Sequence, residues 1–438
     1  MGIRSLLEKK AISLKTFGYI PEYKGTRIFG TEHELGVVLN EKQDDYEKYS
    51  LGINLPGFVH IGGRIYEDSN HIEISTPETR NPFHLLLVEK AMELICSRGE
   101  YVHRLYKNNV DQYERSWGAH ENYWTCASND TLLKIVPFLV TRQIFTGAGW
   151  QRNGHYEISQ RSDFISHVSS KNTVRCERGI ICTREEEKNE KYRRVHFILN
   201  EGNMSEGAIL LKVGTLACML DLAEEEKLPK KLEEYNLGMA VNDLHSIALL
   251  TKNWKVTGMP NTNQALYIQR MCFDAVVQQY FGRDEATNFI INLWYDTLEK
   301  LEKDPMSLSG RLDWVTKKVL LETLVEEDSN ISHYILNVND MDYHDIDRQK
   351  GLFFDLQREG LIERYVSDNS IEEQAKEPPK DTRAYFRGKY VQKIRSRNKN
   401  KECYWNEWNY CPAENNAEKK FEIPDPFNTY EHLIPLIN

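Results

Sequence analysis

No C-x-x-C pair occurs among the eight cysteines of this sequence, which are Cys96, Cys126, Cys176, Cys182, Cys218, Cys272, Cys403 and Cys411. Close pairs of this kind are typical of zinc sites and redox motifs. Most of the cysteines also stand in apolar surroundings, where a thiol behaves as a small hydrophobic side chain. Their spacing therefore favours reduced thiols in a cytoplasmic protein over a disulfide framework or a zinc site.

An unbroken apolar run long enough to cross a membrane is also missing. The longest apolar segment begins at Gly207 and is interrupted by Lys212 and Asp221, so it is too short for a membrane span. We expect a buried helix there, from Ser205 to about Glu225. The stretch MGIRSLLEKKAISLKTFGYI at the start is basic and weakly amphipathic, without an apolar core or a small-residue cleavage site. Neither a secretory signal nor a contact with a membrane is expected.

An excess of positive charge is absent as well. The 438 residues include 56 Lys and Arg against 66 Asp and Glu, which gives a net charge of −10. Bulk charge therefore does not attract nucleic acid, and any polyanion has to be bound locally. Hydrophobic residues make up 40% and charged residues 28%, which is ordinary for a globular protein. The length predicts one large domain with a smaller one, or two of comparable size.

Carboxylates are abundant on segments that alternate like β-strands. In the stretch IFGTEHELG, Glu32 and Glu34 are two residues apart, so a strand projects both on one face. Two more strands are predicted on either side of a tight turn at residues 68–70. Their polar faces consist of Arg64, Tyr66 and Asp68 on the first strand and of His71, Glu73 and Ser75 on the second. A solvated sheet face explains one such strand, but three together bring like charges close unless a cation neutralises them.

A divalent cation with oxygen ligands usually neutralises carboxylates that lie this close together. Mg²⁺ is the expected ion, because the cluster is rich in carboxylates and contains no cysteine. Magnesium with few protein ligands generally accompanies a phosphate-bearing substrate. The sequence has neither a Gly-x-x-x-x-Gly-Lys-Ser/Thr loop nor a Gly-x-Gly-x-x-Gly turn after a strand, so metal and arginines would have to hold the phosphates. The candidate arginines, each more often a surface ion-pair partner, are Arg64, Arg161, Arg184, Arg194, Arg383 and Arg387.

Local signals outline the remaining organisation. Asn81 and Pro82 offer an N-cap and a first-turn proline to the helix that follows them. The chain from about Pro229 to Arg364 is mainly helical in pattern. The polar stretch SDNSIEEQAKEPPKDTR then reads as a linker. Aromatic-rich strand signals after it predict a small C-terminal domain, so the expected domains are residues 1–370 and 371–438.

Motifs in the order of one known family run almost from end to end. They are GTEHELG, GGRIYEDSNHIEISTPE, LYKNNVD, SWGAHENYW, FLVTRQIFTGAGW, EISQRSDF, KYRRVHFILNEGNMSEGAILLKVGT, RLDWVTKKVLLE, MDYHDIDRQKGLF and PPKDTRAYFRGKYV. With them the chain resembles the Pup ligase and depupylase/deamidase family, carboxylate-amine ligases similar to glutamine synthetase. The resemblance implies an α+β fold in which a curved, mainly antiparallel sheet packed with helices, of the glutamine synthetase type, cradles ATP and Mg²⁺. The small C-terminal domain would close on the nucleotide.

The resemblance also implies roles for individual residues. The implied ligands of Mg²⁺ are Glu32, Tyr66 and Glu73, with Glu34 and His196 as further metal contacts. The implied nucleotide contacts are Arg64, Thr76, Arg194 and Trp405, the last of these beneath the nucleotide in CYWNEW. Asp68 matches the catalytic aspartate. Strand alternation independently places Arg64, Tyr66 and Asp68 on one face, as this assignment requires.

Two reactions are consistent with the family. As a ligase, the protein would use ATP to activate the side-chain carboxylate of a C-terminal glutamate on a small, disordered, Pup-like modifier, and Asp68 would accept a proton from the lysine amine of a target protein. As a depupylase or deamidase, it would hydrolyse the same bond with nucleotide bound. The short segment between GTEHELG and GGRIYED, with YHDID and GNMSE, favours the ligase, whereas YKNNVD and DTRAYFRG favour the depupylase. A small-molecule glutamate-amine ligase and a catalytically silent, nucleotide-gated binding protein are the remaining alternatives.

Several positions depart from the family pattern. The segment Glu186-Glu187-Lys188 stands where an acidic residue, proline and histidine are usual, and His33 stands where threonine is usual. The segment from Arg387 to Lys401 contains seven Lys or Arg. It is either a solvated helix face or a surface that attracts phosphate or an acidic modifier. Nucleic acid is a weaker alternative for this segment, because no aromatic residues interleave its basic ones in a stacking pattern.

Overall fold

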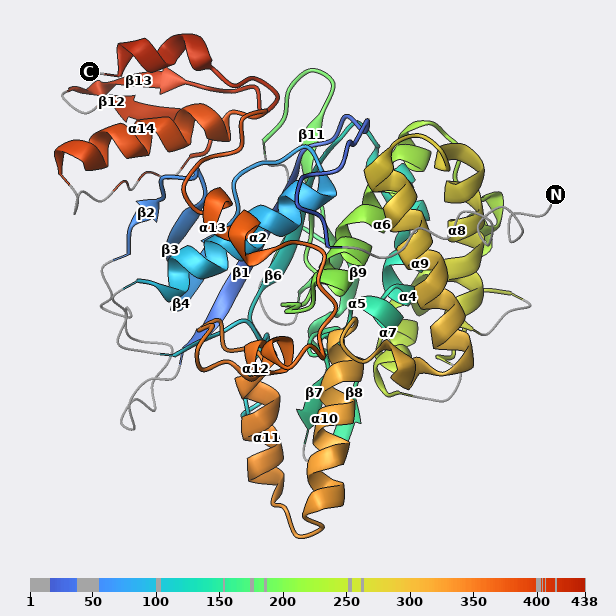
Figure 1. Ribbon diagram of the computed structural model, residues 1–438. Helices are drawn as coiled ribbons and strands as arrows, with labels where there is room; N and C mark the ends of the chain where they lie inside the picture. The colour runs from blue at the N-terminus through green and yellow to red at the C-terminus, as the bar shows by residue number, and fades with distance from the viewer. Residues whose placement is uncertain are drawn as a thin grey trace.

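A nine-stranded sheet forms the centre of the protein (Figure 1). The computed structural model describes residues 16–37, 55–99, 104–152, 154–173, 177–184, 187–250, 254–260, 264–398, 403, 405, 407–413 and 416–437. The strands of this sheet are β1 (Phe29–Val37), β2 (Gly57–Phe58), β3 (Arg64–Asp68), β4 (His71–Ser75), β5 (Leu105–Tyr106), β6 (Ala119–Thr125), β9 (His167–Ser170), β10 (Gly179–Cys182) and β11 (Arg193–Phe197). Their order is β2-β3-β4-β1-β6-β11-β10-β9, and β5 extends β1.

The sheet is mainly antiparallel, as predicted. Only the pairing of β9 with β10 is parallel among the described strands. Strand β1 lies in the middle and shows the expected alternation, because Thr31, His33 and Leu35 are buried while Glu32 and Glu34 are half-buried. The α+β prediction is confirmed by this sheet and the helices that pack on it.

The hairpin of β3 and β4 follows from its turn sequence. Ser69 and Asn70 have φ angles of 50° and 67°, the left-handed values that a two-residue hairpin loop requires. Asparagine tolerates this conformation better than most residues. The turn pairs Asp68 with His71 and so sets the register of the whole hairpin.

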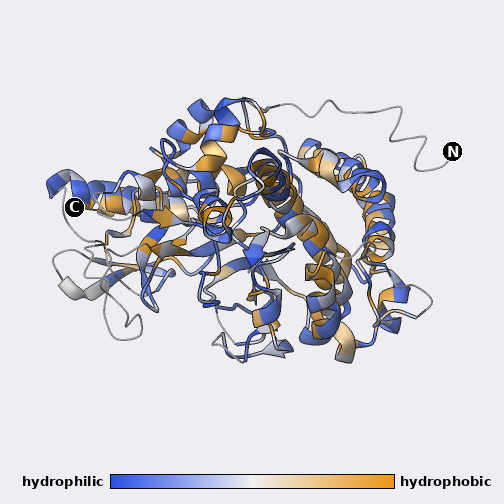
Figure 2. Ribbon diagram, turned by 90° about the horizontal axis from the view of Figure 1, so that it is seen from below, coloured by the Kyte–Doolittle hydropathy of each residue, from blue (hydrophilic) through white to orange (hydrophobic). Residues whose placement is uncertain are grey.

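Two buried helices cover one face of the sheet. Helix α2 (Pro82–Ser97) begins as predicted, because the Asn81 side chain accepts a hydrogen bond from the Phe83 backbone at 2.8 Å. Helix α6 (Glu206–Glu224) confirms the buried helix predicted from Ser205, which is its N-cap residue. Helix α2 contacts β1 and β4, and α6 contacts β6, so their side chains form the core beneath the sheet. The ribbon coloured by hydropathy shows hydrophobic residues along the helices and strands in the interior of the protein (Figure 2).

The helical region predicted from Pro229 to Arg364 is confirmed. Its helices are α7 (Ala240–Ala248), α8 (Ala265–Tyr280), α9 (Glu285–Lys303), α10 (Asp313–Glu327), α11 (His333–Asp342) and α12 (Leu352–Arg358), with short 3₁₀ turns η2 (Lys230–Glu234), η3 (Leu237–Met239) and η4 (Pro305–Leu308). Between β6 and β9 lie α3 (Asn129–Lys134), α4 (Val136–Thr141), α5 (Gln143–Thr146), the hairpin β7 (Trp150–Arg152) and β8 (His155–Glu157), and η1 (Ser162–Phe164). Helices α10 and α11 project from the body as a hairpin (Figure 1).

The C-terminal elements have a core of their own. They are α14 (Ala384–Arg397), β12 (Tyr410–Ala413), β13 (Asn416–Glu422) and η5 (Glu431–Leu436). Phe386, Tyr390 and Trp405 pack together with Phe58, which β2 contributes from the large sheet. The Phe58 backbone also donates a hydrogen bond to the Cys403 carbonyl at 2.8 Å. The domain division at residues 370 and 371 stays a prediction.

The stretch predicted as a linker contains a helix instead. Helix α13 (Asp368–Gln374) begins at Ser367, whose hydroxyl accepts a hydrogen bond from the Ser370 backbone at 3.1 Å. It packs against α2, with Ile371 fully buried and Gln374 contacting His84 at 3.0 Å. The linker prediction was wrong for these residues because one apolar anchor and a cap suffice for a short helix that packs on a neighbour.

Two further predictions concern the state of the cysteines and membrane-spanning helices. Each cysteine in the described part of the chain is a free thiol, and all of these except Cys126 are buried; Cys176 lies outside the described residues. Among the described helices, none combines the length and apolar composition that crossing a bilayer requires.

Candidate functional site

Strand register gathers the predicted polar residues on the face of the sheet opposite α2. Glu34 pairs with Glu73 and Glu73 pairs with Tyr66, while Ser75 stands between Glu32 and Arg64. Directly opposed residues of antiparallel strands project to the same side. The three strands therefore present one continuous polar face, as the alternation in the sequence predicted.

Three acidic residues form a carboxylate cluster at one end of this face. The cluster consists of Glu34, Asp68 and Glu73, each with an oxygen within 4.8 Å of an oxygen of the others. Glu73 is buried and accepts hydrogen bonds from the Tyr66 hydroxyl and, at 3.1 Å, from the Ser75 hydroxyl. The Gly118 backbone donates to Glu34 at 2.7 Å. Asp68 is exposed at the end of β3, so its carboxylate is accessible from solvent.

A second group, the histidine cluster, lies beside it and consists of Glu32, His120 and His196. Glu32 is 3.5 Å from His120 Nδ1 and 3.5 Å from His196 Nε2. Arg194 Nη1 lies 3.4 Å from the same carboxylate and 3.1 Å from the Asn122 side chain. The structure thus brings Glu32 together with two predicted residues, His196 and Arg194, from β11.

His120 was not predicted, although its strand carried a signal. In SWGAHENYW, His120 and Asn122 alternate with apolar or buried residues in the manner of a strand with one polar face. Only the pairing of β6 between β1 and β11 places His120 opposite Glu32.

Burial and neighbouring charges shift the pKa values of these groups in opposite directions. Burial raises the pKa of Glu32, but His120, His196 and Arg194 outweigh it and hold this pKa below its usual value. The pKa of Glu73 is raised well above its usual value by burial and by the charges of Glu32 and Glu34. Burial lowers the pKa of His120 to about 3, so its imidazole is neutral at neutral pH and can donate a lone pair.

The donor atoms fit a divalent cation. The carboxylate cluster supplies hard oxygen ligands, and the raised pKa of Glu73 shows negative charge that a cation would neutralise. The histidine cluster supplies one carboxylate and two imidazoles, a set that also binds divalent metals. The predicted metal ligands Glu34 and Glu73, with Tyr66 beside them, therefore lie at one cluster, and Glu32 and His196 lie at the other.

A pocket opens next to the histidine cluster, and its empty space, counted together with the solvent at its open mouth, is about 500 Å³. It is lined by Ile28, Phe29, Gly30, Thr31, Glu32, Ser75, Thr76, Glu78, Asn122, Tyr123, Trp124, Glu187, Arg194, Arg383, Trp408 and Pro426. Predicted nucleotide contacts Thr76 and Arg194 are in this lining. Thr76 is fixed by its hydroxyl, which accepts a hydrogen bond from the Thr31 backbone at 3.0 Å. Arg64 lies on the same sheet face, with its guanidinium 4.0 Å from the centre of the Tyr66 ring.

Trp405 lies outside the pocket lining. Its ring stacks on Phe58 with centroids 4.4 Å apart and is buried in the C-terminal core. Trp408, three residues later in the same segment, lines the pocket instead. Which tryptophan of this segment faces the pocket depends on how the C-terminal core packs. The nucleotide role of Trp405 stays a prediction.

The other candidate arginines have different partners. Arg161 is buried and donates to the carbonyls of Trp117 and Ile198, and Arg184 is exposed. Arg383 and Arg387, which are buried, pair with the half-buried Glu78 and Glu187 in a group here called the Arg383 clasp. In it, Arg383 donates to Glu78 at 2.7 Å and contacts both oxygens of Glu187, while Arg387 also pairs with Glu78. The clasp ties the start of α14 to the end of β4 and to the segment before β11.

The ion pairs of the Arg383 clasp predict how the stability of the protein changes at acid pH. Burial raises the pKa of Glu78, but Arg387 and Arg383 outweigh it and lower this pKa to about 2 from the usual 4.5. A lowered carboxyl pKa stabilises the fold above the unfolded-state pKa, and this stabilisation is lost as the pH falls from about 4.5 toward 2. Between pH 5.5 and pH 3, the wild type should therefore lose about 2 kcal/mol more unfolding free energy than Glu78→Gln in urea titrations. Equal losses in the two proteins would contradict the pairing, and Glu373→Gln, at an exposed carboxylate, is the control expected to follow the wild type.

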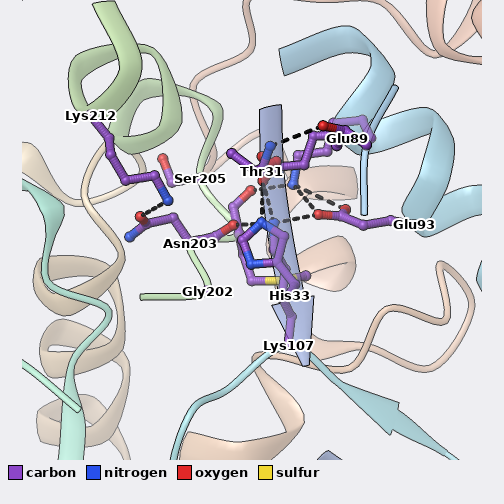
Figure 3. A network of polar contacts seen from close by, with 12 residues as sticks. Thr31, His33, Glu89, Glu93, Lys107, Gly202, Asn203, Ser205 and Lys212 are labelled. Carbon is purple, nitrogen blue, oxygen red and sulfur yellow. Dashed lines mark hydrogen bonds and ion pairs between the residues drawn. The ribbon is translucent and has the colours of Figure 1, made fainter. Parts of the chain in front are cut away.

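A buried ionic network supports β1 from the opposite face (Figure 3). Lys107 Nζ contacts Glu89 at 2.5 Å, Glu93 at 2.6 Å and the Asn203 carbonyl at 2.8 Å. Thr31 donates to Glu89 at 2.8 Å, and His33 Nε2 is 3.3 Å from the same residue. Burial and the charge of Lys107 lower the pKa of His33 to about 4, so it is neutral at neutral pH. His33, between two carboxylates in sequence, thus belongs to the network behind the strand and not to the site.

Comparisons with known proteins agree with this architecture. The sequence profile of the family described as "Pup-ligase protein" matches residues 42–409. The Pup--protein ligase of Acidimicrobium ferrooxidans is 33% identical over 453 aligned positions, which cover 93% of this chain and 97% of that protein. The Pup deamidase/depupylase of Mycolicibacterium smegmatis is 33% identical over 360 positions, covering 76% of this chain and 71% of that protein.

Two solved structures are similar over almost the whole chain. The structure of the ligase PafA in complex with the prokaryotic ubiquitin-like protein Pup has a TM-score of 0.79 and 27% identity, covering 94% of this chain and 92% of that one. The structure of PafA in complex with ADP has a TM-score of 0.76 and 27% identity, covering 100% of this chain and 98% of that one.

Proposed function

Since this chain belongs to the Pup ligase family, we propose that it is an ATP- and Mg²⁺-dependent ligase acting on a small, disordered, Pup-like modifier. It joins the side-chain carboxylate of the modifier's C-terminal glutamate to a lysine of a target protein. The observation that carries this proposal is the meeting of the carboxylate cluster, the histidine cluster and the pocket on one sheet face. A site with cation ligands, arginines and an accessible carboxylate has the parts that carboxylate activation by ATP requires.

The share of each relative's length that aligns with this chain favours ligation over hydrolysis. The Pup--protein ligases of Acidimicrobium ferrooxidans and of a Nocardioides species align over 97% and 98% of their lengths. The depupylase of Acidothermus cellulolyticus and the deamidase/depupylase of Mycolicibacterium smegmatis align over 71% of theirs, at similar identity. Hydrolysis of the same bond, the depupylase reaction, remains the second candidate function, because the identity of this chain to a depupylase reaches 34%.

The carboxylate of the modifier lacks a good leaving group for attack by an amine. A carboxylate attacked by an amine would have to expel oxide, and phosphorylation of the carboxylate by ATP supplies a phosphate leaving group instead. Mg²⁺, when bound, neutralises charge on the phosphates. Glu34, Glu73 and Tyr66 would hold one ion, and Glu32, His120 and His196 would hold another.

The chain's own residues orient the two substrates. Arg194 and Arg64 project from the floor of the site, where they can pair with phosphate oxygens. Thr76 and Trp408 line the pocket that receives the nucleoside. Asp68 lies at the exposed end of the carboxylate cluster, where a lysine of a folded protein can approach it and give up a proton before attacking the activated carbonyl.

The partners and the location follow from the same proposal. Part of the basic segment predicted to attract an acidic modifier is on α14, where Lys393 and Arg397 are exposed, whereas Arg387 is buried in the clasp. Lys399 and Lys401 lie outside the described residues. A cytoplasmic location is part of the proposal because the reaction consumes ATP. The small C-terminal domain closing over the nucleotide likewise remains proposed.

The direction of the reaction is measurable with purified components. The full chain is incubated with ATP, Mg²⁺, a peptide ending in glutamate or glutamine, and an amine acceptor, while ADP, ammonia and conjugate are followed. One ADP is expected per conjugate formed from the glutamate peptide, and none without Mg²⁺. Ammonia or free amine released without accumulation of ADP would instead establish the hydrolase, and nucleotide binding without either product would leave a binding protein.

A further inference from the structure

We propose that the distal end of the α10–α11 hairpin binds the target protein, by contacting a basic, lysine-bearing surface of that target. This inference rests on the proposed function, because it names the surface that receives one of the two protein substrates. The binding surface, here called the hairpin tip, consists of Val325, Glu326, Glu327, Asp328, Tyr334 and Ile335. It is the part of the hairpin farthest from the body of the protein (Figure 1).

Apolar side chains are exposed at the hairpin tip. Val325 is 42% exposed, Ile335 46% and Tyr334 70%. They are three of the ten large hydrophobic side chains exposed in the described part of the chain, although the tip spans only residues 325–335. The same two helices bury Leu321 and Leu336, so these three lie outside the apolar side of the hairpin itself. Exposed aromatic and aliphatic side chains that gather in this way favour a contact with another protein.

The charge of the hairpin tip indicates the kind of partner. Glu326, Glu327 and Asp328 are consecutive and exposed, and no lysine or arginine among the described residues forms an ion pair with them. The ion pair of α10 between Lys318 and Glu322, at 2.6 Å, lies about one turn before them. An acidic surface repels an acidic partner and attracts one that carries lysines. Of the two protein substrates, the target is the one that must present a lysine.

The base of the hairpin lies at the end of the sheet that carries the carboxylate cluster. Just after α11 ends, the His344 carbonyl accepts a hydrogen bond from the Lys107 backbone at 2.8 Å. Lys107 follows β5, which pairs with β1 at Gly36. Glu34 is two residues before Gly36 on β1, and its carboxylate belongs to the same cluster as Asp68. The hairpin therefore projects from the end of the sheet at which Asp68 lies.

The length of the hairpin suits a folded target. Helix α11 has ten residues, so the tip lies about 15 Å from the base. A folded domain of about 100 residues is roughly 30 Å across. Such a domain can contact the tip with one part of its surface and present a lysine to Asp68 with another. A contact at this distance does not depend on the sequence around the lysine.

The test compares a protein acceptor with a small one. Conjugation of a peptide that ends in glutamate is measured with the full-length chain, ATP and Mg²⁺. The acceptor is either cytochrome c, a small folded protein with many surface lysines, or N-α-acetyl-lysine, which is too small to contact the tip and Asp68 together. The two values of kcat/KM separate binding of the target from the chemistry at Asp68.

The tip variant removes the three consecutive negative charges at exposed positions, as Glu326→Gln, Glu327→Gln and Asp328→Asn. The control variant removes three negative charges from other exposed positions, after α6 and in η2, as Glu225→Gln, Glu226→Gln and Glu234→Gln. The two variants therefore have the same net charge and differ only in where the charge is lost.

The wild type should have a higher kcat/KM for cytochrome c than for N-α-acetyl-lysine. The tip variant should lower kcat/KM for cytochrome c about tenfold through KM, as expected for the loss of three exposed ion pairs, and leave the value for N-α-acetyl-lysine unchanged. The control variant should match the wild type with both acceptors.

Three results would overturn the inference and leave the proposed function intact. They are a wild type that does not prefer cytochrome c, a tip variant that loses nothing or loses equally with both acceptors, and a control variant that loses as much as the tip variant. No conjugate with either acceptor would overturn the proposed function itself and this inference with it.

Discussion

Asp68→Asn is expected to slow conjugate formation by about a thousandfold while Mg²⁺-ATP still binds. An amide cannot accept the proton that the attacking lysine amine must lose. Asparagine keeps the shape and one carbonyl oxygen of the aspartate, so the hairpin turn at Ser69 and Asn70 is retained. Single-turnover formation of the conjugate, with calorimetric binding of Mg²⁺-ATP, measures both effects.

Glu67→Gln is the matched control for Asp68→Asn. Glu67 is the preceding residue of β3 and pairs with Ile72, so its side chain projects to the other face of the sheet. It should turn over at the wild-type rate. A parallel loss of turnover and of Mg²⁺-dependent ATP binding in Asp68→Asn would identify Asp68 as a metal ligand in the carboxylate cluster and not as the base.

Lys107→Met is expected to lower the free energy of unfolding by about 3–5 kcal/mol. Lys107 is fully buried between Glu89 and Glu93, and no other cation contacts Glu89 at such a short distance among the described residues (Figure 3). The pKa of Glu89 is held well below its usual value, against the effect of burial, chiefly by Lys107. Removing the ammonium group leaves a buried carboxylate without its partner, and this cost exceeds the packing gained from methionine.

Urea-induced unfolding at pH 7 measures this loss. Lys350→Met is the control, because Lys350 is exposed and its contact with Asp347 at 3.0 Å is a surface ion pair worth less than about 1 kcal/mol. The double variant Lys107→Met with Glu89→Gln should recover part of the stability, since it removes the unpaired charge together with its partner. A loss below 1 kcal/mol in Lys107→Met would show that the network contributes little to the position of β1.

Local features of the fold and the site were predictable because they depend on neighbouring residues. A period of two puts Glu32 and Glu34 on one face and His33 on the other, whatever the strand pairs with. Asn81 before Pro82 caps α2 in the manner that the sequence indicates. The prediction of a polar face that carries Glu73, Tyr66 and Asp68 needed only this alternation and a tight turn.

Features that depend on chain segments far apart were decided by tertiary packing. His120 joins Glu32 and His196 only because β6 lies between β1 and β11 in the sheet. The same holds for Trp408, which faces the pocket because Trp405 fills the C-terminal core.

By itself, the sequence determined which side chains share a face, since backbone stereochemistry makes alternate residues of a strand project to the same side. It did not determine which faces meet, because apolar burial is non-directional and strand order and helix packing are selected by the whole core. Glu187 is the clearest case: its sequence context showed only a departure, and the tertiary structure brought it beside Arg383 at the pocket.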